Sequence, residues 1–478
     1  MNRRQRVAHV VTLVVIGACA LAVAAVAQDG SDLAGLRGSL GSDSDVGGAG
    51  GRAHVAGGEA AESDGAAAAI TKTAREPQLV IWTDALTNYL PTAAHSTMHD
   101  EFIVGWTTQQ DQWSHDIWAR RLRPDGTLLE HFNVATSAGD WLVQPAIAYC
   151  PLHDEYLIAY TNWHDNSGPA DVEARRVAWN GGWMSDIFTV SPGVAKHFGP
   201  SIAHCGPCDE YVVTYTNEWP GGERDLYAQR VRASDGVLLS WSCVATGGGW
   251  QRAYSRVAFH PAMYGGAGGY LIAYTADDYS TGAKTLRYKI THTDLYDLYA
   301  NPELDVSSTS DAVYGLAIAS GQTGFLAAWW DSTTGGFQVR ARRITADGVA
   351  LGPPEGFPVS GVYGLPPPSF ELAVTYAYPG LYLVFWEHGI PSGITDIHGI
   401  FVSEDADTTV GDETVLSGNG NPIYAPAAIC SPMSDCLIVY QWWNPPSDDI
   451  AGDIARLRWV FSDGYESGDT SAWSATVP

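Results

Sequence analysis

The stretch DEYLIAYT, residues 154–161, returns 55 residues later as DEYVVTYT, residues 209–216. Both copies are short apolar runs that end on tyrosine and threonine. Five further runs of this kind occur, so the chain contains seven, spaced by 54 to 59 residues. They begin at Phe102, Tyr156, Tyr211, Tyr270, Phe325, Tyr382 and Cys436. A recurring period of this length is typical of a chain built from repeated structural units.

Each run is one of four strands that we expect in every unit. Shortly before most runs lies another apolar segment, such as PAIAYC (145–150). After each run come a loop and a segment of alternating character, such as DIWARRL (116–122). An Asp-Gly or Asn-Gly turn often follows, and then a fourth segment such as FNVAT (132–136).

Seven units of about 55 residues and four strands predict an all-β, seven-bladed β-propeller. Tandem sandwich domains would need about 100 residues each, and a β-solenoid would use a shorter repeat. We expect neighbouring units to cover the first two strands on both sides, and the third strand to turn its arginines to solvent. The seventh unit ends after its third strand, whereas QLVIWT (78–83) is unpaired ahead of the first unit. We therefore expect this N-terminal strand to complete the last unit and close the ring.

The N-terminal residues 1–27 predict a signal peptide, because arginines precede an apolar run that ends in Ala25-Val26-Ala27. Lipid attachment at Cys19 is the alternative, although the apolar run continues beyond it. Residues 28–76, rich in Gly, Ala, Ser and Asp, predict a flexible linker. Residues 77–462 hold the propeller and residues 463–478 an acidic tail. No later run is long enough to span a bilayer, so we expect a secreted or cell-surface protein.

The repeat pattern over residues 78–462 resembles the propeller repeats of exported bacterial proteins, most of uncharacterised role. The segment DGYESGDTSAW (463–473) resembles a C-terminal tail, DGFESGD followed by tryptophan, of exported bacterial proteins. The resemblance implies an export or surface-sorting role for the tail, with Tyr465 in place of the usual phenylalanine. A disordered acidic tail is the alternative. Neither resemblance names a ligand.

The net charge of −27 makes nucleic acids and anionic lipids poor partners, because both would be repelled. We expect a monomer without a metal or other cofactor, with calcium as the alternative. The segment 405–413 is similar to a calcium loop but has Val410 where glycine is needed, so an acidic turn is favoured. No paired cysteine set or histidine cluster indicates zinc.

Six cysteines follow the signal segment, and an even number in an exported chain predicts disulfides. Cys205 and Cys208 lie in a predicted hairpin turn without the helix that a redox-active pair needs, so we expect a structural bond. Cys430 and Cys436 flank the matching turn of the last unit and predict a second bond. Cys150 and Cys243 could pair by elimination only.

Acidic, aromatic loops follow the apolar runs, and propeller geometry places these loops on one face. Four tryptophans lie among polar neighbours there and are predicted to contact a ligand: Trp113, Trp163, Trp219 and Trp442. Flat amphipathic rings suit stacking on sugars or gripping an extended peptide. Packing between units is the alternative for each of them.

Three carboxylates just past the apolar runs are candidates for catalysis: Glu218, Asp331 and Glu387. Two of them near the axis could serve a secreted, polysaccharide-acting glycosidase. Acidic residues are so common here that chance explains such a trio, and no GxSxG, HExxH or phosphate-loop motif occurs. The sequence therefore favours a non-catalytic binding or scaffold module for carbohydrate or protein, with the glycosidase as the alternative.

Overall fold

The computed structural model describes residues 68–70 and 79–459, apart from 167, 192, 248, 279, 308–312, 333–334, 365, 368, 378–379, 390–394, 417–420 and 432–434. The predicted signal peptide (1–27), most of the predicted linker (28–76) and the tail (463–478) lie outside the described residues. Within the linker segment, β1 (Ala68–Ile70) is a short strand. The described helices are two single turns, η3 (His164–Asn166) and α2 (Met263–Gly266). Over the described ranges, no helix has the length and apolar character needed to cross a membrane.

Each sequence repeat forms antiparallel strands in the predicted order. The first strands are β3 (Thr87–Ser96), β7 (Trp141–Cys150), β11 (Lys196–Cys205), β15 (Trp250–His260), β19 (Val313–Ser320), β23 (Leu372–Ala377) and β27 (Ile423–Cys430). The second strands, which hold the apolar runs, are β4 (Glu101–Gln109), β8 (Glu155–Trp163), β12 (Glu210–Glu218), β16 (Gly269–Asp278), β20 (Gly324–Asp331), β24 (Leu381–Gly389) and β28 (Asp435–Asn444).

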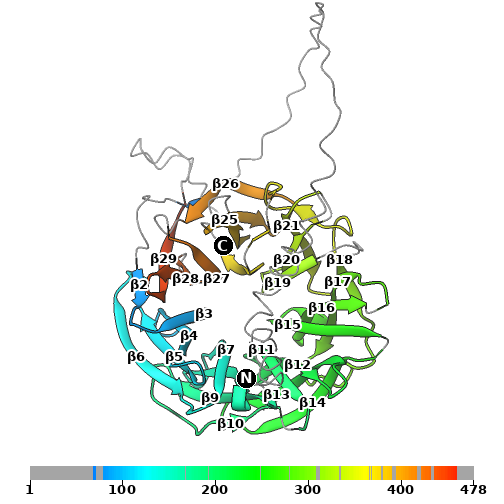
Figure 1. The fold of residues 1–478 in the computed structure, drawn as a ribbon. Coiled ribbons are helices and arrows are strands. Elements are labelled where there is room, and N and C mark those ends of the chain that lie inside the picture. Colours follow the sequence, from blue (N-terminus) through cyan, green and yellow to red (C-terminus); the bar gives the residue numbers. More distant parts are fainter. Residues whose placement is uncertain are drawn as a thin grey trace, which may run out of the picture. The chain divides into compact units, whose positions relative to one another are not determined.

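The outer strands follow in the same way. The third strands are β5 (His115–Leu122), β9 (Ala170–Ala178), β13 (Arg224–Arg232), β17 (Lys284–His292), β21 (Gln338–Thr345), β25 (Thr395–Ser403) and β29 (Ser447–Trp459). The fourth strands are β6 (Leu128–Ala135), β10 (Phe188–Thr189), β14 (Leu238–Ala245), β18 (Leu304–Ser307), β22 (Phe357–Pro358) and β26 (Thr409–Leu416). Figure 1 shows the first strands innermost and the fourth strands outermost.

The strands make six hydrogen-bonded sheets. Repeats three to six each form a separate four-stranded sheet. The first two repeats share one eight-stranded sheet, because His115 of β5 and Trp141 of β7 form a parallel pair. The last sheet has five strands, since β1 and β2 (Leu79–Trp82) both join β29.

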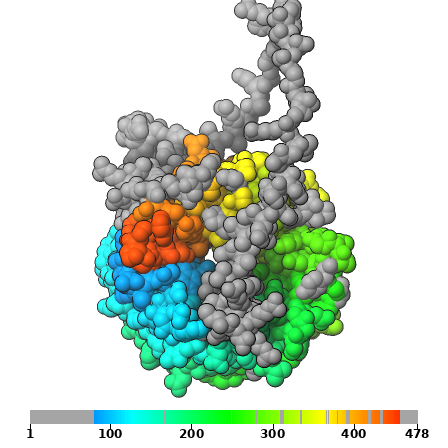
Figure 2. Space-filling model, in the orientation of Figure 1, coloured from blue at the N-terminus to red at the C-terminus, as the bar shows by residue number. Residues whose placement is uncertain are grey.

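The N-terminal strand β2 pairs with the last repeat, as the sequence predicts. Leu79 lies opposite Gly452, and Trp82 lies opposite Ile450, in an antiparallel ladder with β29. Ile81 is fully buried in an apolar cluster with side chains of β4 and β28. In Figure 2 the blue N-terminal residues lie beside the orange-red C-terminal strands. Hydrogen bonds and apolar packing thus join the two ends of the repeat array.

Burial differs between the first and second strands. The second strands are buried along most of their length, and every residue of β8 is buried. The first strands are only partly buried, as in β7, where six of the ten residues are of intermediate exposure. The prediction that both strands are covered on both sides is therefore wrong for the first strand, which in the separate four-stranded sheets also forms the sheet edge.

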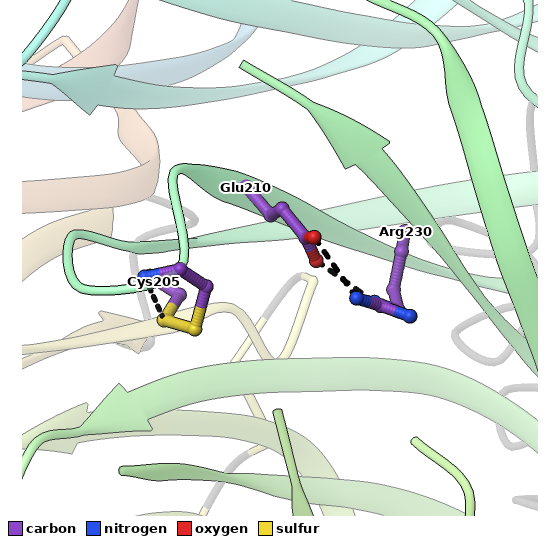
Figure 3. Close-up of a disulfide and its surroundings, with 4 residues drawn as sticks. Cys205, Glu210 and Arg230 are labelled. Atoms are coloured by element: carbon purple, nitrogen blue, oxygen red, sulfur yellow. Dashed lines mark hydrogen bonds and ion pairs between the residues drawn. A yellow bond between two sulfur atoms is a disulfide. The ribbon is translucent and has the colours of Figure 1, made fainter. Parts of the chain in front are cut away.

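The third-strand arginines were expected to face solvent, and this expectation is wrong in the first repeats. Arg176 of β9 is 6% exposed and donates to Glu155 of β8, with Nε–Oε1 at 3.0 Å and Nη2–Oε2 at 2.6 Å. Arg121 pairs with Glu101 as well, with both Nε and Nη2 donating to Oε2. The third repeat has the pair Glu210–Arg230, near the disulfide of Cys205 (Figure 3). A carboxylate at the start of the second strand replaces water around each guanidinium.

The two predicted disulfides are confirmed. Cys205 is bonded to Cys208, and Cys430 is bonded to Cys436. The pairing of Cys150 with Cys243 is not formed, and both thiols are free. Cys150 is enclosed in the apolar layer between the second and third repeats, whereas Cys243 lies on the outer strand β14. Their places at different depths in different repeats explain why elimination gave the wrong pair.

Replacing Cys430 and Cys436 together by alanine is expected to lower the free energy of unfolding by about 2 kcal/mol. The bond closes a loop of only 6 residues, so it removes a modest amount of entropy from the unfolded chain. Urea denaturation would measure the change, with Cys243→Ser as the free-thiol control. An unchanged urea midpoint in the double variant would contradict the expected contribution.

Candidate functional site

One end of each sheet gathers the loops that carry the predicted ligand contacts. Gln109 at the end of β4 lies opposite Thr87 at the start of β3 and opposite His115 at the start of β5. The same antiparallel order holds in the other repeats. We call this end, where second strands finish and first and third strands begin, the loop end.

The four predicted tryptophans all lie at the loop end but in different environments. Trp113 and Trp219 are in loops and are 52% and 39% exposed. Trp163 was expected mid-loop, but it is the last residue of β8 and is 9% exposed. Trp442 lies within β28 and is partly buried, while its neighbour Trp443 is 45% exposed. Trp113, Trp219 and Trp443 are therefore the rings open to a ligand.

Trp163 packs between the second and third repeats. Its ring stacks on Phe198 of β11 at 5.7 Å between centroids, and the Lys196 ammonium lies 5.7 Å from it. Trp163 therefore packs between units, which was the alternative to ligand contact for each tryptophan. The strand β8 continues through Asn162 and Trp163, two residues into the segment expected to be a loop.

A chain of carboxylates and imidazoles runs across the loop end of the first three repeats. His164 lies between Asp140, at 3.7 Å from Nδ1, and Asp171, at 3.1 Å from Nε2. The other oxygen of Asp171 lies 3.5 Å from Nδ1 of His197. Burial lowers the pKa of His197, while Asp171 opposes the shift. The segments NWHDNSGPAD (162–171) and AGDW (138–141) contain Asp140, His164 and Asp171, while His197 lies in β11; sequence alone did not single them out.

His115 and Trp141 form a second polar and aromatic contact at this end. Their rings are parallel within 2° and 5.0 Å apart. The Tyr89 hydroxyl lies 2.7 Å from Nδ1 of His115. Burial lowers the pKa of His115 to about 4, so this ring is neutral at ordinary pH. Trp113 precedes His115 by two residues, in the loop before β5.

Two of the three candidate catalytic carboxylates belong to ion pairs within their own sheets. Glu218 accepts from Nε of Arg224 at 2.8 Å and lies 3.6 Å from the Lys196 ammonium. Asp331 is 1% exposed and lies 3.6 Å from Nε of Arg340. Among the contacts of the described residues, none joins two of the three candidates.

The third candidate, Glu387, is tied to the backbone at a strained position. A left-handed residue recurs near the loop end of each repeat's first strand: Leu90, Gln144, Gly199, Tyr254, Gly315, Phe370 and Ala425. In six of these strands the ladder also shifts register there, as in a β-bulge. Such backbone conformations are costly unless the surroundings hold them.

Glu387 supplies that support between the sixth and seventh repeats. Its carboxylate accepts from the Ala425 amide at 2.6 Å and from the amide and hydroxyl of Ser369, at 3.0 and 2.5 Å. Burial raises the pKa of Glu387 to about 7, against these hydrogen bonds. In the second repeat Thr161 holds the matching position and accepts from the Gly199 amide at 3.0 Å. Glu387 thus takes a structural place that threonine takes elsewhere.

In the described part of the chain, no group of three or more His, Cys, Asp or Glu side chains is arranged so that it could hold a metal ion. The segment 405–413, considered as a calcium loop, is a bend over 405–408 followed by the first five residues of β26. There Asp407 lies 2.7 Å from Nε of Arg343.

Comparison with known proteins gives structural neighbours only. No protein-family profile matches the chain. No curated protein matches it either. A protein of unknown function from Dyadobacter fermentans DSM 18053 is similar over 80% of this chain and 98% of that chain, with 10% identity and a TM-score of 0.50.

Two further solved structures are more distant. The Dos1 propeller matches 77% of this chain and 87% of its own, with 11% identity and a TM-score of 0.42. An endo-arabinase from Bacteroides thetaiotaomicron VPI-5482 matches 54% of this chain and 95% of its own, with 9% identity and a TM-score of 0.36. These likenesses concern the fold, which is all-β and has propellers among its neighbours.

Proposed function

We propose that the chain is an exported, monomeric, seven-bladed β-propeller closed by β2, and that it binds carbohydrate at its loop end without catalysis. The observation that carries the binding function is the exposure of Trp113 and Trp219 on either side of the carboxylate and imidazole chain around His164. Exposed rings beside hydrogen-bonding groups are the usual components of a sugar site. The closed ring is supported by the pairing of β2 with β29 and by contact of β27 with β3.

The state of the carboxylates supports a non-catalytic function. A glycosidase needs one carboxyl group to protonate the leaving oxygen and another to attack or activate water. Glu218 and Asp331 are held by cations, and Glu387 is fully buried with three hydrogen bonds to its oxygens. These contacts give each acid a structural reason to be present.

Replacing Trp113 or Trp219 by alanine is expected to weaken polysaccharide binding about tenfold each, the usual effect of removing a central aromatic contact. Affinity electrophoresis against a panel of soluble polysaccharides would find a ligand, and calorimetry would give the dissociation constant. Trp241→Ala is the matched control, because Trp241 is 63% exposed but lies on the outer strand β14.

Three outcomes would contradict this proposal. Binding that is lost equally in Trp241→Ala would indicate nonspecific adhesion. A new reducing end released from a bound polysaccharide would favour the glycosidase. If no polysaccharide of the panel bound, the ligand would be sought among proteins, starting from a pull-down with the full chain.

A further inference from the structure

The sixth repeat carries a chain of hydrogen bonds at its loop end, apart from the side chains described above. His388 is near the end of β24, and its Nδ1 lies 3.0 Å from Nε2 of His398 in β25. Nδ1 of His398 is in turn hydrogen-bonded to Glu413 in β26. Three neighbouring strands thus join two imidazoles and a carboxylate.

The order of this chain determines where each imidazole carries its proton. The hydrogen bond from His398 lowers the pKa of Glu413, so the carboxylate is ionised and can only accept. His398 therefore donates from Nδ1 and accepts at Nε2, and His388 must donate from its own Nδ1. Burial and, after it, His398 lower the pKa of His388, so this ring is neutral and presents a lone pair at Nε2.

Nε2 of His388 is open to a ligand. It has no hydrogen-bond partner within the described residues, and it is not one of their enclosed unpaired atoms. His388 is partly exposed, whereas its partner His398 is 9% exposed. Tyr363 packs against the His388 ring, at 4.2 Å between centroids, and its hydroxyl donates to Glu413 at 3.4 Å. The acceptor is therefore held in a defined position at the surface.

The charges around this acceptor favour a positively charged donor. Asp396 lies opposite His388 in the ladder between β24 and β25, and the side chain of Glu413 is 33% exposed. Both carboxylates oppose the lowering of the pKa of His388, because each stabilises positive charge at this ring. The whole chain carries −27, so a cation is also attracted from a distance.

An ammonium group combines the two properties that this place requires, because it donates hydrogen bonds and carries positive charge. A hydroxyl group would satisfy the lone pair but not the carboxylates. Resting on the carbohydrate-binding function above, we propose that the loop end of the sixth repeat binds an amino sugar whose ammonium group donates to Nε2 of His388. The Tyr363 ring beside it offers an aromatic surface for the sugar. A polysaccharide with free amino groups is then the expected ligand.

Two oligosaccharides of equal length test the proposal. A chitosan hexasaccharide carries free amino groups, and the fully N-acetylated chitin hexasaccharide has the same backbone without the charge. Calorimetry with the full chain at low ionic strength would compare them, slightly below neutral pH. The chitosan oligosaccharide is expected to bind about tenfold more tightly, the usual contribution of a hydrogen bond to a charged group.

Two variants test the named groups. Glu413→Gln keeps an acceptor for His398 and removes the charge, so chitosan affinity is expected to fall about threefold with little change in melting temperature. His388→Phe keeps a ring against Tyr363 and removes the acceptor, so chitosan affinity is expected to fall about tenfold. Asp405→Asn is the matched control, because Asp405 is an exposed carboxylate of the same repeat at the opposite end, after β25.

The outcomes separate this inference from the function beneath it. Equal affinity for the two oligosaccharides would overturn the inference. So would an equal loss in Asp405→Asn and Glu413→Gln, because it would indicate attraction by the total charge alone. If a neutral polysaccharide still bound through Trp113 and Trp219, the proposed function would stand without the inference. Absence of any carbohydrate binding would overturn both.

Discussion

Replacing Glu155 by leucine is expected to lower the free energy of unfolding by about 3–5 kcal/mol, the usual cost of removing one partner of a buried ion pair. Glu155 is completely buried, and Arg176 is 6% exposed. In the leucine variant the Arg176 guanidinium would keep its hydrogen bond to the Ser234 carbonyl, at 2.9 Å, but would lose its carboxylate partner. Urea denaturation followed by tryptophan fluorescence would measure the loss.

Two further variants identify the cause of that loss. Glu155→Leu combined with Arg176→Met should recover most of the stability, because an apolar pair of similar volume can replace a buried ion pair. Glu210→Leu should cost less, since the side chain of Arg230 is 19% exposed and also reaches Ser240. Equal losses in Glu155→Leu and Glu210→Leu would contradict the dependence on burial.

Glu387 is expected to make the protein more stable in mild acid than at neutral pH. Its folded pKa of about 7 lies above the ordinary value of 4.5. Between these pH values the folded chain keeps the proton that the unfolded chain has released, so the free energy of unfolding falls as pH rises. The difference corresponds to about 3 kcal/mol, fully present below pH 4.5 and lost as pH rises through 7.

Glu387→Gln should remove this pH dependence and keep acceptors for the backbone. The last repeat already has a glutamine, Gln441, at the matching position of its second strand. Unfolding curves from pH 4 to pH 8 for both proteins would give the difference in slope. Glu404→Gln is the control, because Glu404 is also buried and accepts from Thr323 and Tyr376. Parallel curves for the unmodified chain and Glu387→Gln would disprove the assignment.

The order of the strands could be predicted because it depends on features of the amino-acid sequence itself. A period near 55 residues sets the unit, and the missing fourth strand of the last unit points to residues 78–83. The burial of Arg176 could not be read in the same way. Alternation assigns a residue to one face of a strand, but it does not tell whether that face is exposed to solvent. For Arg176 this depends on the carboxylate of Glu155, 21 residues away.

The candidate site shows the same division. Trp113 and Trp163 both lie among polar residues, and the outcome depends on where the strand stops, which polar neighbours do not determine. The structural role of Glu387 could have been inferred from the sequence, because alignment of the repeats places it at the same position as Thr161 and Gln441. The chain of Asp140, His164 and Asp171 joins two loops and a strand, so only the fold brings it together.

The ladder between β2 and β29 has a consequence for how the protein is made. β2 is near the beginning of the chain, whereas its partner is the last described strand, and a hydrogen bond from Asn88 to Asp448 spans 360 residues. During synthesis the N-terminal strand therefore cannot pair until nearly the whole polypeptide has been made. A chain that leaves the ribosome in order would therefore lack this pairing until its final repeat has been made. Premature termination anywhere before β29 would then leave a product with an exposed strand edge, which would be open to attack by proteases.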